Sequence, residues 1–328
     1  MKHNAPWHSA TLRAQHDLSP SVREFEIRPE RGVRPWSVGS HLDLRVWVDG
    51  REEKRSYSLV GLPDGAGADE VYRIAVRRAD AGRGGSRWLW SLQTGDEILI
   101  GEPNNHFEIG WQAPHTLLVA GGIGITPLLG MAQLLARRGA PLRMLYAARC
   151  ADELIYGDAL RAALGDRLRT LCSDAGQRID LDAEIAVLPP GAQLALCGPL
   201  RLMDAARAAW QRSGRPSAEL RFETFGNSGS RPAEPFWVEL PRHGLRIDVP
   251  IGRNLLDVLE EHGVQALSDC RRGEYGLCAM DIVSVQGTVD HRDVFFSAEQ
   301  KHANQRLCAC VSRVCDGGVV LDSAFRPD

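Results

Sequence analysis

The hydrophobic and polar positions follow two different rhythms along the chain. Over residues 22–107, short stretches such as 42–48, 72–76 and 97–100 alternate between apolar and polar positions and are bounded by Gly, Asp or Pro. A period of two with frequent turns is typical of antiparallel strands. We therefore predict an antiparallel barrel or sandwich for this part of the chain.

The rhythm changes after residue 111. An apolar strand is predicted at 117–120, and after a glycine-rich turn a helix begins with Thr126 as its N-cap and Pro127 as its first residue, ending at Gly139. Later strands and helices are predicted at 142–147, 158–164 and 194–197, and a last helix ends near 214. Strands that alternate with helices indicate βαβ units and a parallel sheet.

A third pattern begins after a Gly-, Ser- and Pro-rich linker at 227–235. Residues 236–240 and 245–249 alternate on either side of a turn, which predicts a hairpin, and an amphipathic helix follows at 255–262. The chain is long enough for more than one core. We predict a first domain at 1–111, a second at 112–226 and a third at 236–328.

The composition is that of a globular chain and excludes several classes of protein. Hydrophobic residues make up 44% and charged residues 25% of the 328 residues, which argues against wholesale disorder. A formal net charge of −3 provides no basic field for nucleic acid. The uncharged stretch 116–136 is long enough to span a membrane, but Gly121, Gly122, Gly124 and Pro127 interrupt it, so we predict no membrane span.

Eight cysteines are the one unusual count. Four of them fall between Cys270 and Cys310. The N-terminal residues 1–8 lack the apolar segment of a signal peptide, so we expect a cytoplasmic chain, in which disulfides are rare. The clustering therefore favours a metal site over disulfides.

Two glycine turns are candidates for nucleotide binding. The first, Gly121-Gly122-Ile123-Gly124, lets a ligand approach the backbone, and the N-terminus of the next helix attracts phosphate. The second, Cys197-Gly198-Pro199, ends another strand at the edge where α/β sheets bind ligands. Together the turns favour a nucleotide site, although Cys197 alone is typical of a buried core residue.

Two polar segments of the first domain also have candidate chemistry. Residues 55–58, Arg-Ser-Tyr-Ser, place an aromatic ring between hydroxyl groups and near an arginine, which suits a planar cofactor. Residues 82–86 contain a Gly-Gly-Ser turn that suits a phosphate. Either segment alone is typical of an ordinary surface strand or loop.

The order of these motifs resembles one protein family. The Arg-x-Tyr-Ser-Leu run, the Gly-Gly-Ile-Gly-Ile-Thr-Pro turn, the Cys-Gly-Pro turn and the cysteine-rich C-terminal domain are similar to those of the phthalate dioxygenase reductase family, which includes vanillate O-demethylase reductases. The resemblance covers essentially the whole chain. It implies a multidomain fold with a flavin-binding antiparallel β-barrel, an α/β parallel-sheet domain for NADH and a C-terminal β-grasp [2Fe–2S] ferredoxin domain. The flavin that it implies is FMN.

The resemblance also assigns residues to each cofactor. For the isoalloxazine and ribityl groups of FMN it implies Arg55, Ser56, Tyr57, Ser58, Ala75 and Val76. For the FMN phosphate it implies Gly82, Gly84, Gly85 and Ser86. For the nicotinamide it implies Gly122, Thr126, Cys197, Gly198 and Pro199.

Two further positions complete the expected cofactor site. Phe225 matches the aromatic residue that covers the flavin in the family, although a core phenylalanine at a domain end would also explain it. Asp174 suits the adenosine ribose, because a carboxylate accepts two hydroxyl hydrogen bonds and repels a 2′-phosphate. We therefore predict NADH rather than NADPH. Arg149, in a neighbouring loop, argues against this prediction, because an arginine can accommodate the 2′-phosphate of NADPH.

The cysteine spacing matches a plant-type [2Fe–2S] site except at one position. Such ferredoxins use C-x4-C-x2-C with a distant fourth cysteine. Cys270 and Cys278 match the first and third ligands, and Cys310, in Cys-Val-Ser-Arg, matches the family's fourth, but Tyr275 stands at the second position. A phenol has a pKa near 10 against about 8.5 for a thiol, and it is a harder ligand, so it substitutes poorly at an iron–sulfur site.

Several outcomes stay open for this site. The cluster is absent, it is labile with three thiolates and an oxygen ligand, or Cys308 completes the ligand set. A zinc site at Cys270, Cys278, Cys308 and Cys310 is a rival, but C-x7-C and C-x-C lack the short knuckles usual in zinc sites.

We therefore predict an NADH-dependent reductase component that passes electrons from NADH to FMN, to a [2Fe–2S] cluster and to a separate oxygenase. The expected oxygenase is a Rieske non-haem iron enzyme acting on an aromatic compound, and the chain is expected to be a monomer. Nicotinamide delivers two electrons at once and a cluster accepts one, so a flavin must stand between them. No residue is predicted as acid, base or nucleophile. The alternatives are an NADH:flavin or NADH:acceptor reductase with a cluster-deficient third domain, and a non-catalytic nucleotide- or metal-binding module.

Overall fold

The computed structural model describes residues 7–63, 71–79, 84–225 and 231–323. The chain divides into two compact units, residues 1–223 and residues 224–328. The first unit contains an antiparallel sheet and a parallel sheet, and the second contains a mixed sheet. The three boundaries predicted from the sequence stay predictions, because the first two predicted domains fall within one unit.

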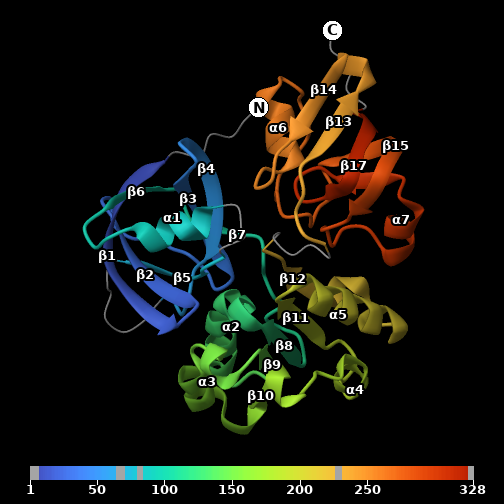
Figure 1. Cartoon of the computed structure of the whole chain (residues 1–328). Helices are drawn as coiled ribbons and strands as arrows, with labels where there is room; N and C mark the ends of the chain where they lie inside the picture. Colours follow the sequence, from blue (N-terminus) through green and yellow to red (C-terminus); the bar gives the residue numbers. More distant parts are fainter. Residues whose placement is uncertain (1–6, 64–70, 80–83, 226–230, 324–328) are drawn as a thin grey trace. The chain divides into compact units, whose positions relative to one another are not determined.

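The N-terminal sheet is built entirely of antiparallel pairs in the order β4-β3-β6-β1-β2-β5, with β7 paired to β3 (Figure 1). A bridge between Leu59, just after β4, and Ile74 in β5 joins the two ends of the sheet and closes the barrel. Apolar side chains such as Phe25, Leu42 and Leu89 fill its interior. The elements are β1 (His8–Ser19), β2 (Val22–Pro29), β3 (Ser40–Val48), β4 (Arg51–Ser58), β5 (Tyr72–Arg77), α1 (Gly85–Ser91), β6 (Glu97–Ile100) and β7 (Asn104–Asn105).

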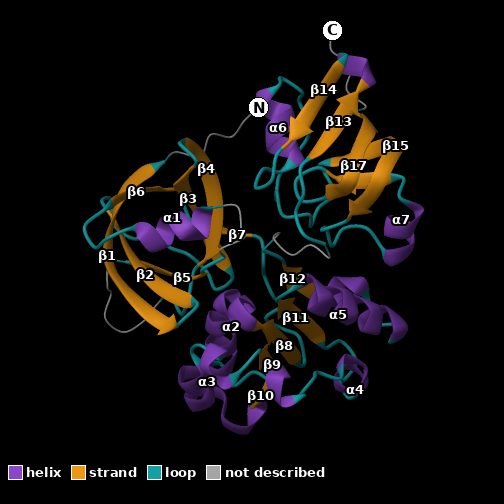
Figure 2. Ribbon diagram, in the orientation of Figure 1, coloured by secondary structure: helices purple, strands orange, loops and turns teal. Residues whose placement is uncertain are grey.

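The second sheet is parallel throughout, in the order β10-β9-β8-β11-β12. The chain runs from β8 through β9 to β10 at one edge of the sheet, and then returns to β11 on the other side of β8. Because each crossover is right-handed, this change of direction puts helices on both faces of the sheet, as Figure 2 shows. The elements are β8 (Thr116–Gly121), α2 (Ile125–Arg137), β9 (Leu142–Ala148), α3 (Gly157–Leu164), β10 (Leu168–Cys172), α4 (Leu181–Ala186), β11 (Gln193–Cys197), α5 (Leu200–Arg212) and β12 (Leu220–Glu223).

The start of α2 differs from the prediction. A 3-10 turn at Gly122–Gly124 runs directly into the helix, so Gly124 is the N-cap and no side chain caps the helix. Thr126 lies inside the first turn, where its hydroxyl donates to the Ile123 carbonyl oxygen at 3.0 Å. The predicted N-cap role of Thr126, and Pro127 as the first helical residue, were therefore wrong.

Contacts at α2 and just before α3 help to join the barrel and the parallel sheet within the first unit. A Cβ atom on Gly130 of α2 would lie 2.1 Å from the Gly61 carbonyl oxygen, so only glycine allows this helix to approach the loop after β4. The Tyr156 hydroxyl, just before α3, donates to Glu24 Oε2 of β2 at 2.6 Å. Burial and the nearby Glu24 carboxylate raise the pKa of Tyr156, so the phenol stays protonated.

The C-terminal unit has a five-stranded mixed sheet in the order β14-β13-β17-β15-β16. Strands β13 and β17 are parallel, and the other pairs are antiparallel. Helix α6 contributes Leu255, Leu256 and Leu259 to its core, which gives a β-grasp arrangement. The elements are β13 (Phe236–Leu240), β14 (Leu245–Val249), α6 (Leu255–Glu261), β15 (Ala279–Asp290), α7 (Ala298–Ala303), β16 (Arg306–Cys308) and β17 (Arg313–Asp322).

A buried arginine fixes two loops of this unit. Arg313, at the start of β17, is only 5% exposed and donates to the carbonyl oxygens of Glu234 at 2.7 Å, Pro250 at 3.1 Å and Arg253. Its guanidinium also lies over the Phe236 ring, 5.0 Å from the centroid. Burial lowers the pKa of Arg313 to about 10, so the side chain is still charged at neutral pH.

The uncharged stretch 116–136 folds as β8, the glycine turn and most of α2. No helix in the described ranges is long and apolar enough to cross a membrane.

Candidate functional site: two cofactor regions and a cysteine cluster

Strand β4 presents its four candidate residues to opposite faces. Arg55 and Tyr57 lie on one face, where Tyr57 packs against the barrel core, while Ser56 and Ser58 lie on the other. The Ser56 hydroxyl donates to Asp43 Oδ1 at 2.5 Å, and Lys54 Nζ donates to Asp43 Oδ2 at 2.8 Å. Burial alone would raise the pKa of Asp43, but Lys54 and Ser56 outweigh it and lower the pKa.

Ser58, at the end of β4, reaches a residue that sequence reasoning missed. Its hydroxyl donates to Glu223 Oε2 at 3.2 Å, and Glu223 is 1% exposed at the end of β12. Glu223 is paired in register with Cys197 of β11, which is paired in turn with Ala120 of β8. Ser58 of the predicted flavin motif therefore contacts the carboxyl edge of the parallel sheet through the buried Glu223 carboxylate. No strand was predicted at 220–223, so the local sequence pattern gave no signal for Glu223.

The predicted phosphate turn lies beside Arg55. A Cβ atom on Gly85 would lie 2.8 Å from Arg55 Cγ, so the glycine leaves room for the arginine stem. Gly84 has a φ of +80°, and the Ser86 hydroxyl accepts the Ala79 backbone N–H at 3.1 Å. Gly82 lies outside the described residues. The structure thus brings Arg55 together with the described part of the Gly-Gly-Ser turn.

Ala75 and Val76 are buried in β5, next to the helix that follows this turn. Their exposed fractions are 6% and 2%. The Trp90 indole of α1 donates to the Val76 carbonyl oxygen at 3.2 Å, which ties α1 to β5.

The two glycine turns of the parallel sheet touch through their backbones. A Cβ atom on Gly124 would lie 2.2 Å from the Cys197 carbonyl oxygen, and one on Gly198 would lie 3.1 Å from Gly121 Cα. A Cβ atom on Gly121 would lie 2.7 Å from Pro199 Cδ. The sequence-predicted residues of the nicotinamide site therefore form one contiguous edge. Gly122 has a φ of +54°, and a Cβ atom placed on it would meet no atom of the described residues within 4 Å. Thr126 is buried one turn into α2.

Asp174 follows β10 and Arg149 follows β9, so both lie at the same edge of the sheet. Arg149 Nε is 3.4 Å from Asp174 Oδ2, and the Asp174 backbone N–H donates to the Arg149 carbonyl oxygen at 2.9 Å. Both side chains are more than half exposed. The Asp174 carboxylate thus partly neutralises Arg149, the cation that argued against NADH in the sequence. Phe225, two residues after β12, is half-buried and belongs to the C-terminal unit by its contacts, and its role stays a prediction.

Three thiols gather in the core of the C-terminal unit. Cys278 precedes β15, Cys308 ends β16, and Cys310 lies in the turn before β17. Cys278 Sγ is 3.1 Å from Cys310 Sγ, and Cys278 also shares a hydrogen bond with the Cys308 thiol. These two bonds lower the pKa of Cys278 to about 3, and the same interaction raises the pKa of Cys308 and of Cys310. The cluster therefore favours a thiolate, the form that binds metals.

The other two candidate ligands lie in the loop before β15. The Glu274 backbone N–H donates to Cys270 Sγ at 3.4 Å. Tyr275 is 39% exposed, and burial of part of its ring together with Glu274 raises the pKa of its phenol. A protonated phenol is a poor ligand, so three cysteines of the predicted set fit an iron–sulfur cluster and the second position does not.

In the part of the chain that the structure describes, no three His, Cys, Asp or Glu side chains converge on one metal ion. A [2Fe–2S] cluster instead divides its ligands between two iron atoms. Cys278 contacts both Cys308 and Cys310, and thiolates are the ligands of such clusters.

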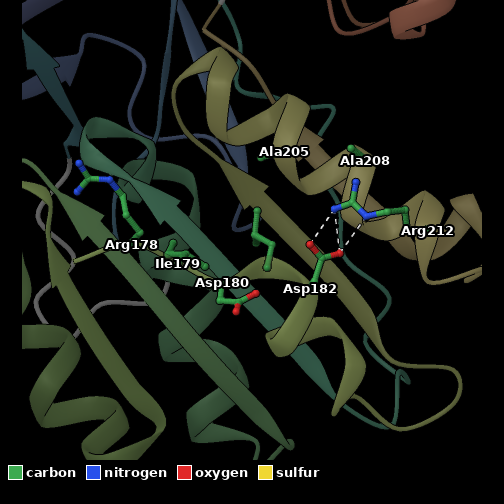
Figure 3. Close-up of a pocket in the computed structure, with 8 residues that line it drawn as sticks. Arg178, Ile179, Asp180, Asp182, Ala205, Ala208 and Arg212 are labelled. Carbon is green, nitrogen blue, oxygen red and sulfur yellow. Dashed lines mark hydrogen bonds and ion pairs between the residues drawn. The ribbon is translucent and has the colours of Figure 1, made fainter. Parts of the chain in front are cut away.

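A surface pocket of about 470 Å³ lies between α4 and α5 (Figure 3). Arg212 of α5 and Asp182 of α4 form a two-pronged ion pair across it, with both Nη2–carboxylate distances at 2.8 Å. None of the sequence-predicted site residues lines this pocket, which is lined by Arg178, Ile179, Asp180, Leu181, Asp182, Ala205, Ala208 and Arg212. The charges inside it neutralise each other, so the pocket gives no sign of a cofactor.

Comparison with known proteins places these features in a family. Residues 238–315 match the family of 2Fe-2S iron-sulfur cluster binding domains. The chain is 33% identical to the phthalate 4,5-dioxygenase oxygenase reductase subunit of Pseudomonas putida, and the match covers 94% of each chain. The chain belongs to the phthalate dioxygenase reductase family.

Other similar proteins show how widely the architecture is used. The chain is 37% identical to the heme-dependent oxidative N-demethylase beta subunit of Ectopseudomonas mendocina, over 95% of this chain and 97% of that protein. The solved phthalate dioxygenase reductase, described as a modular structure for electron transfer from pyridine nucleotides to [2Fe–2S], matches with a TM-score of 0.75 and 29% identity over 96% of this chain and 98% of that one. Full-length CYP116B46 of Tepidiphilus thermophilus matches with a TM-score of 0.64 and 32% identity, but this chain spans only 42% of its length.

Membership in the phthalate dioxygenase reductase family confirms the predicted fold class and enzyme class. The chain is an oxidoreductase, the reductase component of a two-component oxygenase system, and passes electrons through a flavin to a [2Fe–2S] centre. The alternatives of a cluster-deficient reductase and a non-catalytic module are not favoured.

Proposed function

We propose that the chain uses FMN and NADH and delivers electrons to a Rieske-type oxygenase component. One observation carries the assignment of the hydride-transfer site: the hydrogen bond of 3.2 Å from Ser58 of the barrel to Glu223 of the parallel sheet. Hydride transfer requires direct contact between nicotinamide and flavin, so residues of the two motifs must adjoin. When bound, FMN accepts the hydride and releases electrons singly to the cluster.

The residues of the chain act by binding and orientation. Arg55, which is ion-paired with Glu53 and lies beside Gly85, and the backbone N–H groups near Gly85 would hold the FMN phosphate, while Tyr57, packed against the barrel core, would support the isoalloxazine. Glu223 accepts a hydrogen bond from the Ser58 hydroxyl, which leaves the lone pairs of the Ser58 oxygen to face the polar edge of the flavin. The backbone edge at Gly122 and Cys197 seats the nicotinamide ring.

The test is anaerobic reduction of the FMN-reconstituted protein by NADH, followed by flavin absorbance. Ser58→Ala removes a hydrogen bond to a charged acceptor, so we expect flavin reduction to slow by about 10- to 100-fold. Ser91→Ala is the matched control, because the Ser91 hydroxyl is exposed and donates only to the Trp88 carbonyl oxygen. Equal rates in the two variants would contradict the role of Ser58, and failure to bind FMN would contradict the proposal as a whole.

The pairing of Arg149 with Asp174 supports a preference for NADH. The Asp174 carboxylate neutralises Arg149, and it repels the 2′-phosphate of NADPH while accepting ribose hydroxyls. We expect kcat/KM for NADH to exceed that for NADPH by at least about tenfold, the factor that 1.4 kcal/mol provides. A preference for NADPH in the unmodified protein would contradict this role.

The oxygenase partner has two candidate types. The family resemblance favours a Rieske partner acting on an aromatic compound. A haem-dependent oxygenase is a second candidate, because the Ectopseudomonas relative at 37% identity is the beta subunit of a heme-dependent N-demethylase. Cytoplasmic location and a monomeric state also belong to the proposal. Electron transfer to purified oxygenases of each type, with size-exclusion chromatography of the reductase alone, distinguishes these possibilities.

A further inference from the structure

The environment of Cys308 differs from that of an ordinary core cysteine. Cys308 is completely buried at the end of β16, where it is paired in register with Ala279, the residue after Cys278. The Ala309 backbone N–H donates to the Cys278 carbonyl oxygen at 3.0 Å, which fixes the two segments beside each other. The Cys308 and Cys278 thiols are hydrogen-bonded, and Cys278 Sγ is 3.1 Å from Cys310 Sγ. Cys308 therefore adjoins two family-matched ligands.

Tyr275 has a different environment. Its side chain is 39% exposed, in a loop where Gly273 and Gly276 have φ values of +75° and +71°. A Cβ atom on Gly276 would lie 2.3 Å from the Phe295 ring, so the loop is packed tightly against that ring just after the tyrosine. A phenol oxygen is a hard donor, whereas a buried thiol beside two others is a soft one.

We propose that Cys308 replaces the missing second cysteine, so that Cys270, Cys278, Cys308 and Cys310 hold the [2Fe–2S] cluster and Tyr275 stays outside the ligand set. Two of these cysteines come from the loop before β15 and two from the end of β16 and the turn after it. The set therefore provides the four thiolates that a two-iron centre requires. The inference rests on the proposed electron-transfer function, and it names a ligand that the C-x4-C-x2-C spacing does not contain.

The experiment measures iron, acid-labile sulfide, visible absorbance and the electron paramagnetic resonance signal of the dithionite-reduced full chain. The variants are Cys308→Ala, Tyr275→Phe and the double variant Cys308→Ala with Tyr275→Cys. Cys315→Ala is the matched control, because Cys315 is also a buried cysteine of this unit, and its thiol lies 3.8 Å from the Pro232 carbonyl oxygen. Circular dichroism establishes that each variant is folded.

We expect two irons and two sulfides per chain in the unmodified protein and in Tyr275→Phe and Cys315→Ala. In Cys308→Ala, iron and sulfide should fall at least about tenfold, since loss of a ligand weakens metal binding. The double variant should recover them, because it restores the conventional spacing.

Three results would overturn or relocate the inference. A cluster retained in Cys308→Ala but lost in Tyr275→Phe would make Tyr275 the ligand. A cluster retained in both variants would show that neither residue is needed. Absence of iron and sulfide from the reconstituted unmodified protein, with FMN still reduced by NADH, would instead refute the cluster part of the proposed function.

Discussion

Replacing Gly124 by alanine tests whether the two glycine turns form the nicotinamide site. The added Cβ would lie 2.2 Å from the Cys197 carbonyl oxygen and 2.4 Å from its carbonyl carbon. Both neighbours are backbone atoms that no rotamer change can move. The turns must separate by about 0.8 Å before the shortest contact reaches 3.0 Å, the lower limit for real Cβ contacts. A displacement near 1 Å costs about 100-fold when it misplaces a reacting group.

Gly157→Ala is the matched control for this substitution. Gly157 also begins a helix of the parallel-sheet domain, α3, but its nearest neighbour to an added Cβ is Leu154 Cβ at 3.8 Å. Stopped-flow reduction of the flavin by NADH should therefore slow by about 10- to 100-fold in Gly124→Ala and stay within about twofold in Gly157→Ala. Urea unfolding of both variants separates a local shift from global loss of structure. Unchanged hydride transfer in a folded Gly124→Ala protein would refute the assignment of these turns to nicotinamide.

Two further predictions concern stability. Tyr156→Phe removes a hydrogen bond to Glu24 and should cost about 1.5–3 kcal/mol at neutral pH by urea unfolding. The pKa of Tyr156 is raised from 10.0 in the folded state, so its stabilisation is complete below pH 10 and is lost as pH rises further. The variant should therefore lose less stability than the unmodified protein above pH 10, and parallel curves would contradict this. Arg313→Met should cost about 3 kcal/mol or more in the unfolding of the C-terminal unit, because it leaves buried carbonyl oxygens without donors, whereas exposed Arg246→Met should cost less than about 1 kcal/mol. Similar losses in both arginine variants would refute the explanation.

The sequence predicted those elements whose pattern is regular. Strand β6 alternates throughout and β3 alternates over most of its length, and the predicted ranges agree closely with β3, β5 and β6. Strand β1 was missed because its register shifts between Leu12 and Ala14 and again between Asp17 and Ser19. Such bulges break the period of two on which the prediction depends. The predicted N-cap of α2 was also wrong. A 3-10 turn at Gly122–Gly124 leads into the helix, so the helix begins before Thr126, the residue with capping chemistry.

The candidate site was predictable where backbone geometry demands particular residues. Gly124 is required by a backbone contact, and Gly121 and Gly198 lie in tight contacts beside it, so the packing of the two turns leaves a recognisable motif in the sequence. Glu223 was not predictable from local pattern, because its partner Ser58 lies 165 residues away. The gathering of Cys308 with Cys278 and Cys310 likewise depends on the pairing of β15 with β16, which spacing alone could not specify.

Arg313 has an evolutionary consequence. Its hydrogen-bond partners at Glu234, Pro250 and Arg253 are main-chain carbonyl groups, which every amino acid provides. Mutations that change the side chains at these three positions therefore leave the acceptors in place, whereas mutation of Arg313 removes all the donors at once. We expect homologous sequences to have many different residues at positions 234, 250 and 253 but arginine at position 313. One conserved side chain would then permit variation in the loops that it fixes.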